Sequence, residues 1–220
     1  MATLSGIQDD VRSYTEVSSN VLSNSVINTM INNTEKRIFR TVDLDVSRGH
    51  MTANLTADNP YLSMPGSTST TFISVDWMQI KDSAGNRKFL IQKDLSFLTE
   101  YNKNSNTTGV PKYYGNWDMD TVYVAPTPSS GFTVELAMNR MPSSLTSAGS
   151  SGTTWLSTNG ELALLYGSLI EAYLFMKGEQ DIMATYDKRF QESLMGLKML
   201  GEAKETTQEY RVGRVIREKQ

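Results

Sequence analysis

Two pairs of aspartates are the residues of this chain that come closest to a metal site. Asp43 and Asp45 are separated by one residue, as are Asp118 and Asp120, and acidic residues at this spacing occur in sites that bind divalent cations. Neither pair has further acidic or phosphate-binding residues beside it. We therefore interpret the second pair as a turn before a strand and the first pair as the end of a helix.

The composition excludes most kinds of catalytic centre. The chain has no cysteine and a single histidine, His50, so disulfides, thiol catalysis, thiolate sites and multi-histidine metal sites are ruled out. A catalytic triad around His50 would need a nucleophile that the sequence does not offer. No nucleotide-binding, hydrolase or zinc-protease motif occurs. We interpret His50 as an exposed or turn residue and expect no enzymatic activity, metal or cofactor.

An aromatic group offers a third kind of chemistry, stacking on a ligand. Tyr113, Tyr114, Trp117 and Tyr123 are close in sequence, with Lys112 as the nearby cation. Such rings can stack on bases or sugars, but with so few cations we interpret them as core or interface packing. The net charge of −3 is also too small to indicate nucleic-acid binding by bulk electrostatics.

Apolar residues at helical spacing predict helices at both ends of the chain. We expect capping boxes at Ser5 with Gln8 and at Thr158 with Glu161, and Gly178 divides the C-terminal helices into a hairpin. Glu35 falls on the polar side of its helix. The four predicted apolar stripes are Leu4, Ile7, Val11 and Tyr14; Leu22, Val26, Ile27, Met30, Ile31, Thr34, Ile38 and Phe39; Leu162, Leu165, Leu169, Tyr173 and Met176; and Ile182, Met183, Tyr186, Phe190, Leu194, Leu197 and Leu200.

The middle of the chain is punctuated by proline and glycine, with short alternating runs between them, which is typical of strands. We expect a hairpin across the turn at residues 82–86 and a short helix at 94–101. The predicted strands are 69–78, 88–91, 121–124 and 132–138.

These elements predict an α+β fold, in which the N- and C-terminal helices form a bundle and a small antiparallel β-domain is inserted between them. An extended C-terminal tail completes the chain. The expected divisions are 1–42 for the N-terminal helices, 43–145 for the β-domain, 146–204 for the helical hairpin and 205–220 for the tail. No apolar run is long enough to cross a membrane, and the N-terminus does not resemble a secretory signal.

The C-terminal segment mixes cations with aromatic and β-branched residues, which is unusual for a disordered end. Two interpretations remain open, a solvated terminus and a segment that docks on a partner. The residues that would do the docking are Tyr210, Arg211, Val212, Arg214, Val215, Ile216 and Arg217.

The order of the motifs resembles the phage head-to-tail adaptor, or connector, proteins, including the tail tubular protein A type and, in the helical part, gp6-like connectors. The residues that carry this resemblance are Glu35-Lys36-Arg37-Ile38, Gly109-Val110-Pro111-Lys112-Tyr113-Tyr114, Ala125-Pro126-Thr127-Pro128, Met141-Pro142, Trp155-Leu156 and Glu161-Leu162-Ala163-Leu164-Leu165-Tyr166-Gly167. Ser129-Ser130-Gly131 departs from the more acidic turn that we would expect.

The resemblance implies a structural protein of the virion neck, assembled in the host cytoplasm. Such proteins form a ring, usually dodecameric, below the portal protein, and the ring surrounds a channel through which genomic double-stranded DNA passes without specific binding. The C-terminal tail, with its residues from Tyr210 to Arg217, would dock on the portal. The β-domain would receive the tail nozzle or tail fibre protein.

The alternative is a monomeric or trimeric ligand-binding module of a tail-associated protein. Its β-domain would bind a sugar or a cell-surface ligand through Tyr113, Tyr114, Trp117 and Trp77. The two hypotheses differ in assembly, because an adaptor forms rings or binds the portal and a binding module does not.

Overall fold

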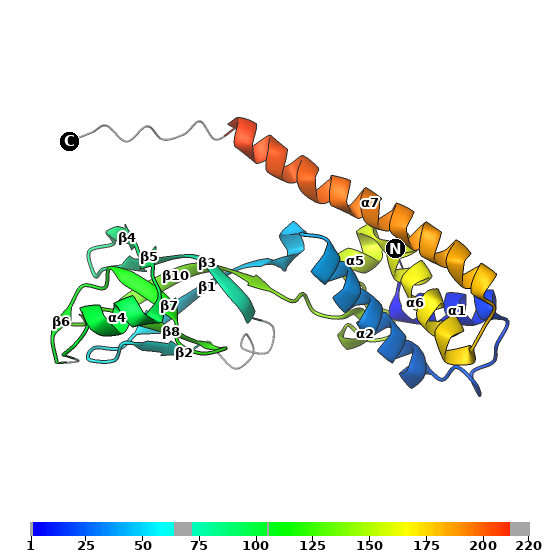
Figure 1. Ribbon diagram of the computed structural model, residues 1–220, viewed down its shortest axis with the longest axis horizontal. Helices are drawn as coiled ribbons and strands as arrows, with labels where there is room; N and C mark the ends of the chain where they lie inside the picture. Colours follow the sequence, from blue (N-terminus) through cyan, green and yellow to red (C-terminus); the bar gives the residue numbers. More distant parts are fainter. Residues whose placement is uncertain (1, 64–71, 105, 212–220) are drawn as a thin grey trace. The chain divides into compact units, whose positions relative to one another are not determined.

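The computed structural model describes residues 2–63, 72–104 and 106–211, with side chains up to Glu202. The fold is α+β, with helices at both ends of the chain and sheets between them (Figure 1). The chain divides into two compact units. The helical unit comprises Met1–Val46 and Ser143–Gln220, and the β unit comprises Ser47–Pro142.

The helical unit is built around α6 (Glu161–Met176), which packs against α1, α2, α5 and α7. A central helix has neighbours on most of its sides, and buried residues accordingly occur all around α6. The other elements of the unit are α1 (Leu4–Thr15), α2 (Asn24–Thr41), the 3-10 turn η2 (Leu145–Ser147), α5 (Trp155–Asn159) and α7 (Gln180–Arg211), while a second 3-10 turn, η1 (Asp45–Ser47), lies at the boundary with the β unit.

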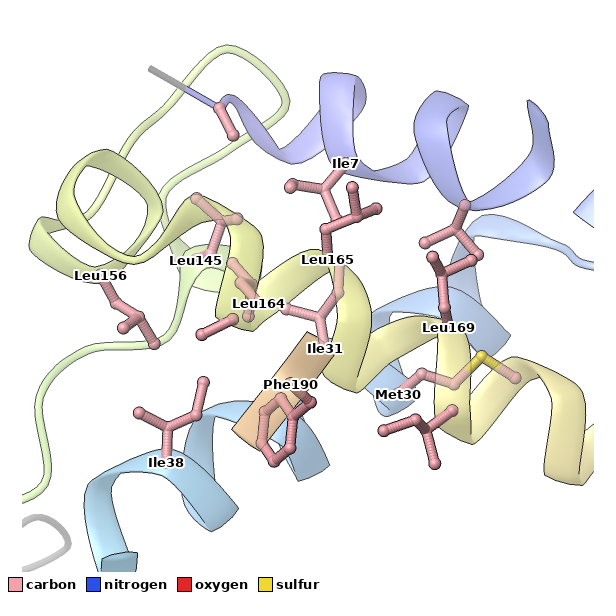
Figure 2. Close-up of a cluster of buried hydrophobic side chains, with 14 of the residues drawn as sticks. Ile7, Met30, Ile31, Ile38, Leu145, Leu156, Leu164, Leu165, Leu169 and Phe190 are labelled. Atoms are coloured by element: carbon pink, nitrogen blue, oxygen red, sulfur yellow. The ribbon is translucent and has the colours of Figure 1, made fainter. Parts of the chain in front are cut away.

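The core of the helical unit is a single apolar cluster to which all of its helices contribute (Figure 2). Phe190 of α7 is fully buried, and the ring lies near Ile31 of α2 and the α6 side chains in the close-up. Burial of one large side chain contributes roughly 1.5–3 kcal/mol, so this cluster is the main source of stability of the unit.

The helix caps differ from the predicted capping boxes. The N-cap of α1 is Thr3, whose hydroxyl accepts a hydrogen bond from the backbone N–H of Gly6. A capping box is present at α5, between Thr154 and Ser157. The predicted pairs at Ser5 and Thr158 are wrong, because each of these residues already lies inside the first turns of a helix.

A buried carboxyl on α2 holds the turn that precedes α5. Glu35 is 4 % exposed, and its Oε1 accepts a hydrogen bond of 3.0 Å from the backbone N–H of Leu145. The Ser144 hydroxyl oxygen lies 2.5 Å from Glu35 Oε2 and 2.5 Å from Asn32 Oδ1. The prediction that Glu35 lies on the polar side of its helix is therefore wrong, because a turn more than one hundred residues downstream covers it. Burial raises the pKa of Glu35, while the hydrogen bonds from Ser144 and Leu145 act in the opposite direction.

The β unit contains two four-stranded sheets and a two-stranded ladder. The first sheet has the order β1-β10-β3-β4 and is antiparallel throughout; the second has the order β2-β8-β7-β5, in which the β5–β7 pair is parallel; β6 and β9 form the parallel ladder. The strands are β1 (Arg48–Leu55), β2 (Tyr61–Ser63), β3 (Phe72–Lys81), β4 (Arg87–Phe89), β5 (Ile91–Gln92), β6 (Thr108–Gly109), β7 (Tyr113–Asn116), β8 (Thr121–Ala125), β9 (Thr127–Pro128) and β10 (Phe132–Arg140).

The two larger sheets pack face to face, with Met78 and Leu136 of the first sheet and Val122 and Val124 of the second in one apolar cluster. The short helix α4 (Leu95–Tyr101) lies against β7 and β8 of the second sheet. Gly115 permits this contact, because a Cβ at this position would lie 2.5 Å from the carbonyl oxygen of Lys93.

Several predicted elements are present in the β unit. The hairpin is formed by β3 and β4, the short helix is α4, and β8 and β10 occupy the last two predicted strands. Residues 69–71 of the first predicted strand lie outside the described residues. Strands β1, β2, β6, β7 and β9 were not predicted. His50 is exposed, in agreement with the first of its two interpretations, and it lies on β1 rather than in a turn.

Helix α7 continues through Arg211, where an extended tail was expected from residue 205. The sequence after Gly201 contains Ala, Lys, Glu and Gln and has no glycine or proline before Gly213. These residues favour a helix, and they explain why α7 does not end with the bundle. The remainder of the predicted tail, residues 212–220, lies outside the described residues.

Candidate interaction site

The aspartate pairs have structural roles. Asp118 and Asp120 lie in the turn between β7 and β8, where Asp118 Oδ1 accepts a hydrogen bond of 3.0 Å from the Asp120 backbone N–H. This bond is the main cause of the lowered pKa of Asp118. Asp45 begins the turn η1. Within the described ranges, no group of three or more acidic or histidine residues could hold a metal ion, and no described helix is long and apolar enough to cross a membrane.

The aromatic residues considered as a platform do not all lie on one surface. Tyr114 is buried between the two sheets, whereas Tyr113 packs against Phe97 and Tyr101 beside α4. Trp117 contacts the rings of Tyr61 and Tyr123, at centroid distances of 5.1 and 5.6 Å. Trp77 lies on the other sheet, between His50 and Phe89. The structure therefore does not bring Tyr113, Tyr114, Trp117 and Trp77 together into one binding surface.

The proposed docking residues are described only in part. Tyr210 and Arg211 form the last two positions of α7, and only their backbone is described. The other members of the set, Val212, Arg214, Val215, Ile216 and Arg217, lie outside the described residues.

The helical unit exposes apolar side chains at one end of α6. Leu174 and Phe175 are 54 % and 55 % exposed, although half of the α6 residues are buried. They line an open groove of about 500 Å³ between α6 and the N-terminal half of α2, together with Val26, Met30 and Glu171. Apolar side chains gathered in this way on a surface mark sites of protein contact.

A second depression lies at the other end of α6. It has a volume of about 250 Å³ and is bounded by Leu162 of α6 and by Gly196 and Leu200 of α7. Leu162 is 58 % exposed, so its assignment to a buried stripe is wrong. The stripe of Leu165 and Leu169 faces α1 instead, and Leu162 lies at the margin where neighbouring helices no longer cover α6.

The sequence did not reveal either surface. Leu174 and Phe175 belong to a long apolar run in which every residue is equally compatible with burial. The available signal was the length of that run, because one helix face cannot bury so many consecutive apolar residues. The two exposed apolar surfaces at the ends of α6 are suited to contact with other proteins.

Comparison with protein families agrees with this interpretation. The model of the family described as SU10 adaptor protein matches residues 2–217, which is nearly the whole chain. Comparison with curated proteins gives no significant match. The chain therefore belongs to the SU10 adaptor protein family. It is a phage adaptor protein and hence a structural component of the virion.

Proposed function

We propose that this protein forms a ring in the neck of the virion, between the portal protein and the tail, and that DNA passes through the channel of the ring. The observation that carries the proposal is the family match over residues 2–217. The exposed apolar surfaces at both ends of α6 support it, because a subunit in a ring contacts two neighbours. The ring is dodecameric and has no enzymatic activity.

The C-terminal segment is proposed to dock on the portal. Arg211, Arg214 and Arg217 can bind carboxylates through paired hydrogen bonds, while Tyr210 and the β-branched residues add apolar contact. Ordering this segment costs conformational entropy. A ring offsets the cost, because each tail is held at a high effective concentration once its neighbours have bound.

The helix α7 provides a route for this docking. Its buried positions in the bundle extend to Leu197 and Gly201, and the helix continues for ten further residues. At about 1.5 Å per residue, this continuation carries the C-terminal segment roughly 15 Å beyond Gly201. The β unit is proposed to receive the nozzle or fibre protein. A lumen that passes DNA without binding it is consistent with the net charge of −3.

The experiment is negative-stain microscopy of the purified protein, alone and mixed with portal-containing particles. We expect the full chain to form rings on portals. We expect a chain that ends at Glu205 not to bind portals. Because Phe190, Leu194 and Leu197 are retained, the shortened chain should keep its unfolding temperature, and this serves as the control for folding. Normal incorporation of the shortened chain would refute portal docking through the tail. A full chain that does not bind portals would refute the adaptor ring.

A further inference from the structure

We propose that the β unit receives the tail protein along β1, and that the tail protein binds there by adding an extended strand to the free side of β1. This inference rests on the proposed function, in which the β unit receives a nozzle or fibre protein, and it names the surface and the form of the partner. The occupant is an extended segment of that tail protein with apolar side chains at alternate positions.

Strand β1 is the long edge strand of the β unit. The edges of the two larger sheets are β1 and β4 in the first and β2 and β5 in the second. β1 has eight residues, whereas β2 and β4 have three each and β5 has two. Proteins commonly keep edge strands short, because a long edge is a template for another strand. Among the described edges of these sheets, β1 alone is long enough to pair with a partner over several residues.

The backbone of β1 has an unused side. In an antiparallel ladder, alternate residues direct their N–H and C=O groups away from the partner strand. β1 is paired with β10 on one side, and no backbone hydrogen bond between described residues reaches residues 49–55 from the other side. β2 contacts β1, but its described pairing is with β8. The free side of β1 therefore offers a row of donors and acceptors to an extended chain.

β1 lacks the features that block the addition of a strand. Edge strands are commonly protected by lysine, by proline, by a bulge or by a charge that points toward the core. β1 contains neither lysine nor proline, and its one arginine, Arg48, stands at the first position. Its pairing with β10 has no register shift, whereas the pairing of β10 with β3 has two. The short edge β4, in contrast, contains Arg87 and Lys88.

The side chains of β1 define what the added strand has to carry. Met51 and Ala53 pack against the apolar cluster between the sheets but are only half-buried. An added strand with apolar side chains at alternate positions would cover both residues and extend this core. On the opposite face, His50, Thr52 and Asn54 are exposed, so the intervening side chains of the added strand can be polar.

The symmetry of a ring argues against a second copy as the occupant. Two β1 strands pair with each other around a two-fold axis, which gives a closed pair of copies rather than a ring. A head-to-tail contact between copies would need a second edge of similar length. The other described edges of the two larger sheets have three residues or fewer, so a strand from another protein fits β1 better.

Hydrogen exchange along β1 is the direct test. The probes are the purified nozzle protein and the purified fibre protein, each added to portal-bound rings of the full chain. When a tail protein binds, we expect amide exchange within residues 49–55 to slow at least tenfold in roughly half of the amides, because alternate N–H groups point to the free side. The amides of β10, which has a strand on each side, serve as the reference and should not change.

A charge on the core-facing side of β1 should weaken the binding of the tail protein at least tenfold. Ala53→Lys adds an ammonium group that reaches water while the edge is free and that an added strand would bury. Because Ala53 is half-buried at the edge, the variant should keep the unfolding temperature of wild type. Gln92→Lys is the matched control, since it makes the same change in charge at an exposed position on the short edge β5, and it should change the affinity less than twofold.

The possible outcomes separate this inference from the function on which it rests. If neither tail protein binds portal-bound rings, both the proposed role of the β unit and the inference are overturned. Binding that leaves the exchange of residues 49–55 unchanged would overturn strand addition and leave the role of the β unit intact. Slow exchange that is already present before a tail protein is added would identify a second copy, or its C-terminal segment, as the occupant, and would also overturn the inference.

Discussion

The hydrogen-bonded carboxyl of Glu35 allows the stability of the helical unit to be tested at a single group. Two substitutions separate the role of this carboxyl as a hydrogen-bond acceptor from the role of its charge. Glu35→Ala removes the acceptor of the buried Leu145 N–H, and an unsatisfied buried donor costs about 1–3 kcal/mol. Glu35→Gln keeps an oxygen for that N–H and replaces the charge with an amide donor, so we expect its cost at pH 7 to be less than about 1 kcal/mol.

The burial of Glu35 gives the expected direction of the pH dependence, and a hydroxyl group lies beside its carboxyl. The hydroxyl of Ser144 has one proton but lies 2.5 Å from both Glu35 Oε2 and Asn32 Oδ1. A protonated Glu35 can donate to Ser144, which then donates to Asn32, and all three groups are satisfied. Burial is the largest cause of the raised pKa of Glu35, whereas the hydrogen bond from Ser144 to the ionised carboxylate lowers it.

A raised pKa in the folded chain means that the folded state binds the proton more tightly than the unfolded state. The stability that wild type gains from protonated Glu35 is therefore fully present below the ordinary value of 4.5. It is lost as the pH rises through the higher folded pKa. Relative to wild type, Glu35→Gln should be least stable at pH 4 and should improve as the pH rises above 4.5.

Thermal unfolding of wild type and both variants between pH 4 and pH 8 provides the assay. For a chain of this size, each kcal/mol changes the unfolding temperature by roughly 2–4 °C. Because all other titratable groups are the same in both proteins, their contributions cancel in the difference in unfolding temperature between Glu35→Gln and wild type. A stability difference that stays constant over this range, or that changes in the opposite direction, would refute the raised pKa of Glu35 in the folded chain. An unchanged unfolding temperature in Glu35→Ala would show that the hydrogen bond to Leu145 contributes nothing to stability.

Three further substitutions test the packing of each unit. Gly115→Ala should destabilise the β unit by about 1–3 kcal/mol in urea unfolding, because its Cβ would meet Lys93 O at 2.5 Å and Leu98 Cδ1 at 2.6 Å; an unchanged midpoint would contradict this. Phe190→Ala should cost about 3–5 kcal/mol, since the ring is fully buried in the helical core, and a loss below 1 kcal/mol in thermal unfolding would argue against that core. Thr154→Ala should cost about 1 kcal/mol through loss of the capping box, whereas Thr158→Ala, in the same helix, should cost less when measured in the same way.

The sequence predicted the helices and several strands because their signals are local. Helical spacing located α1, α2 and α7, and the turn at residues 82–86 predicted the β3–β4 hairpin. The break at Gly178 was also predictable. A Cβ there would lie 2.4 Å from the Tyr173 ring, so the chain needs glycine at this point.

The features that were missed depend on distant parts of the chain. Strand β1 pairs with β10, which lies far downstream in the sequence, with Leu55 opposite Phe132 and Arg48 opposite Asn139. The small and polar residues of β1 give little pattern of their own. Glu35 looks solvent-exposed until the turn at Leu145 covers it. Leu162 looks buried until the neighbours of α6 are known. The candidate interaction site consists of such residues, and local periodicity therefore did not indicate it.

The pairing of β1 with β10 has a consequence for how this protein can change. Arg48 and Asn139, near the two ends of the β unit, lie opposite each other in the register. The two ends of the β unit thus lie on paired strands. In the connectivity of the chain, the β unit is an insertion in the helical unit, and the β1–β10 pairing already holds its two ends together. Since loop length adds little to the entropy of closure, the β unit can grow, shrink or be exchanged at little entropic cost to the helical fold. Contacts made by the β unit can therefore diversify during evolution while the helices that carry the proposed ring contacts stay the same.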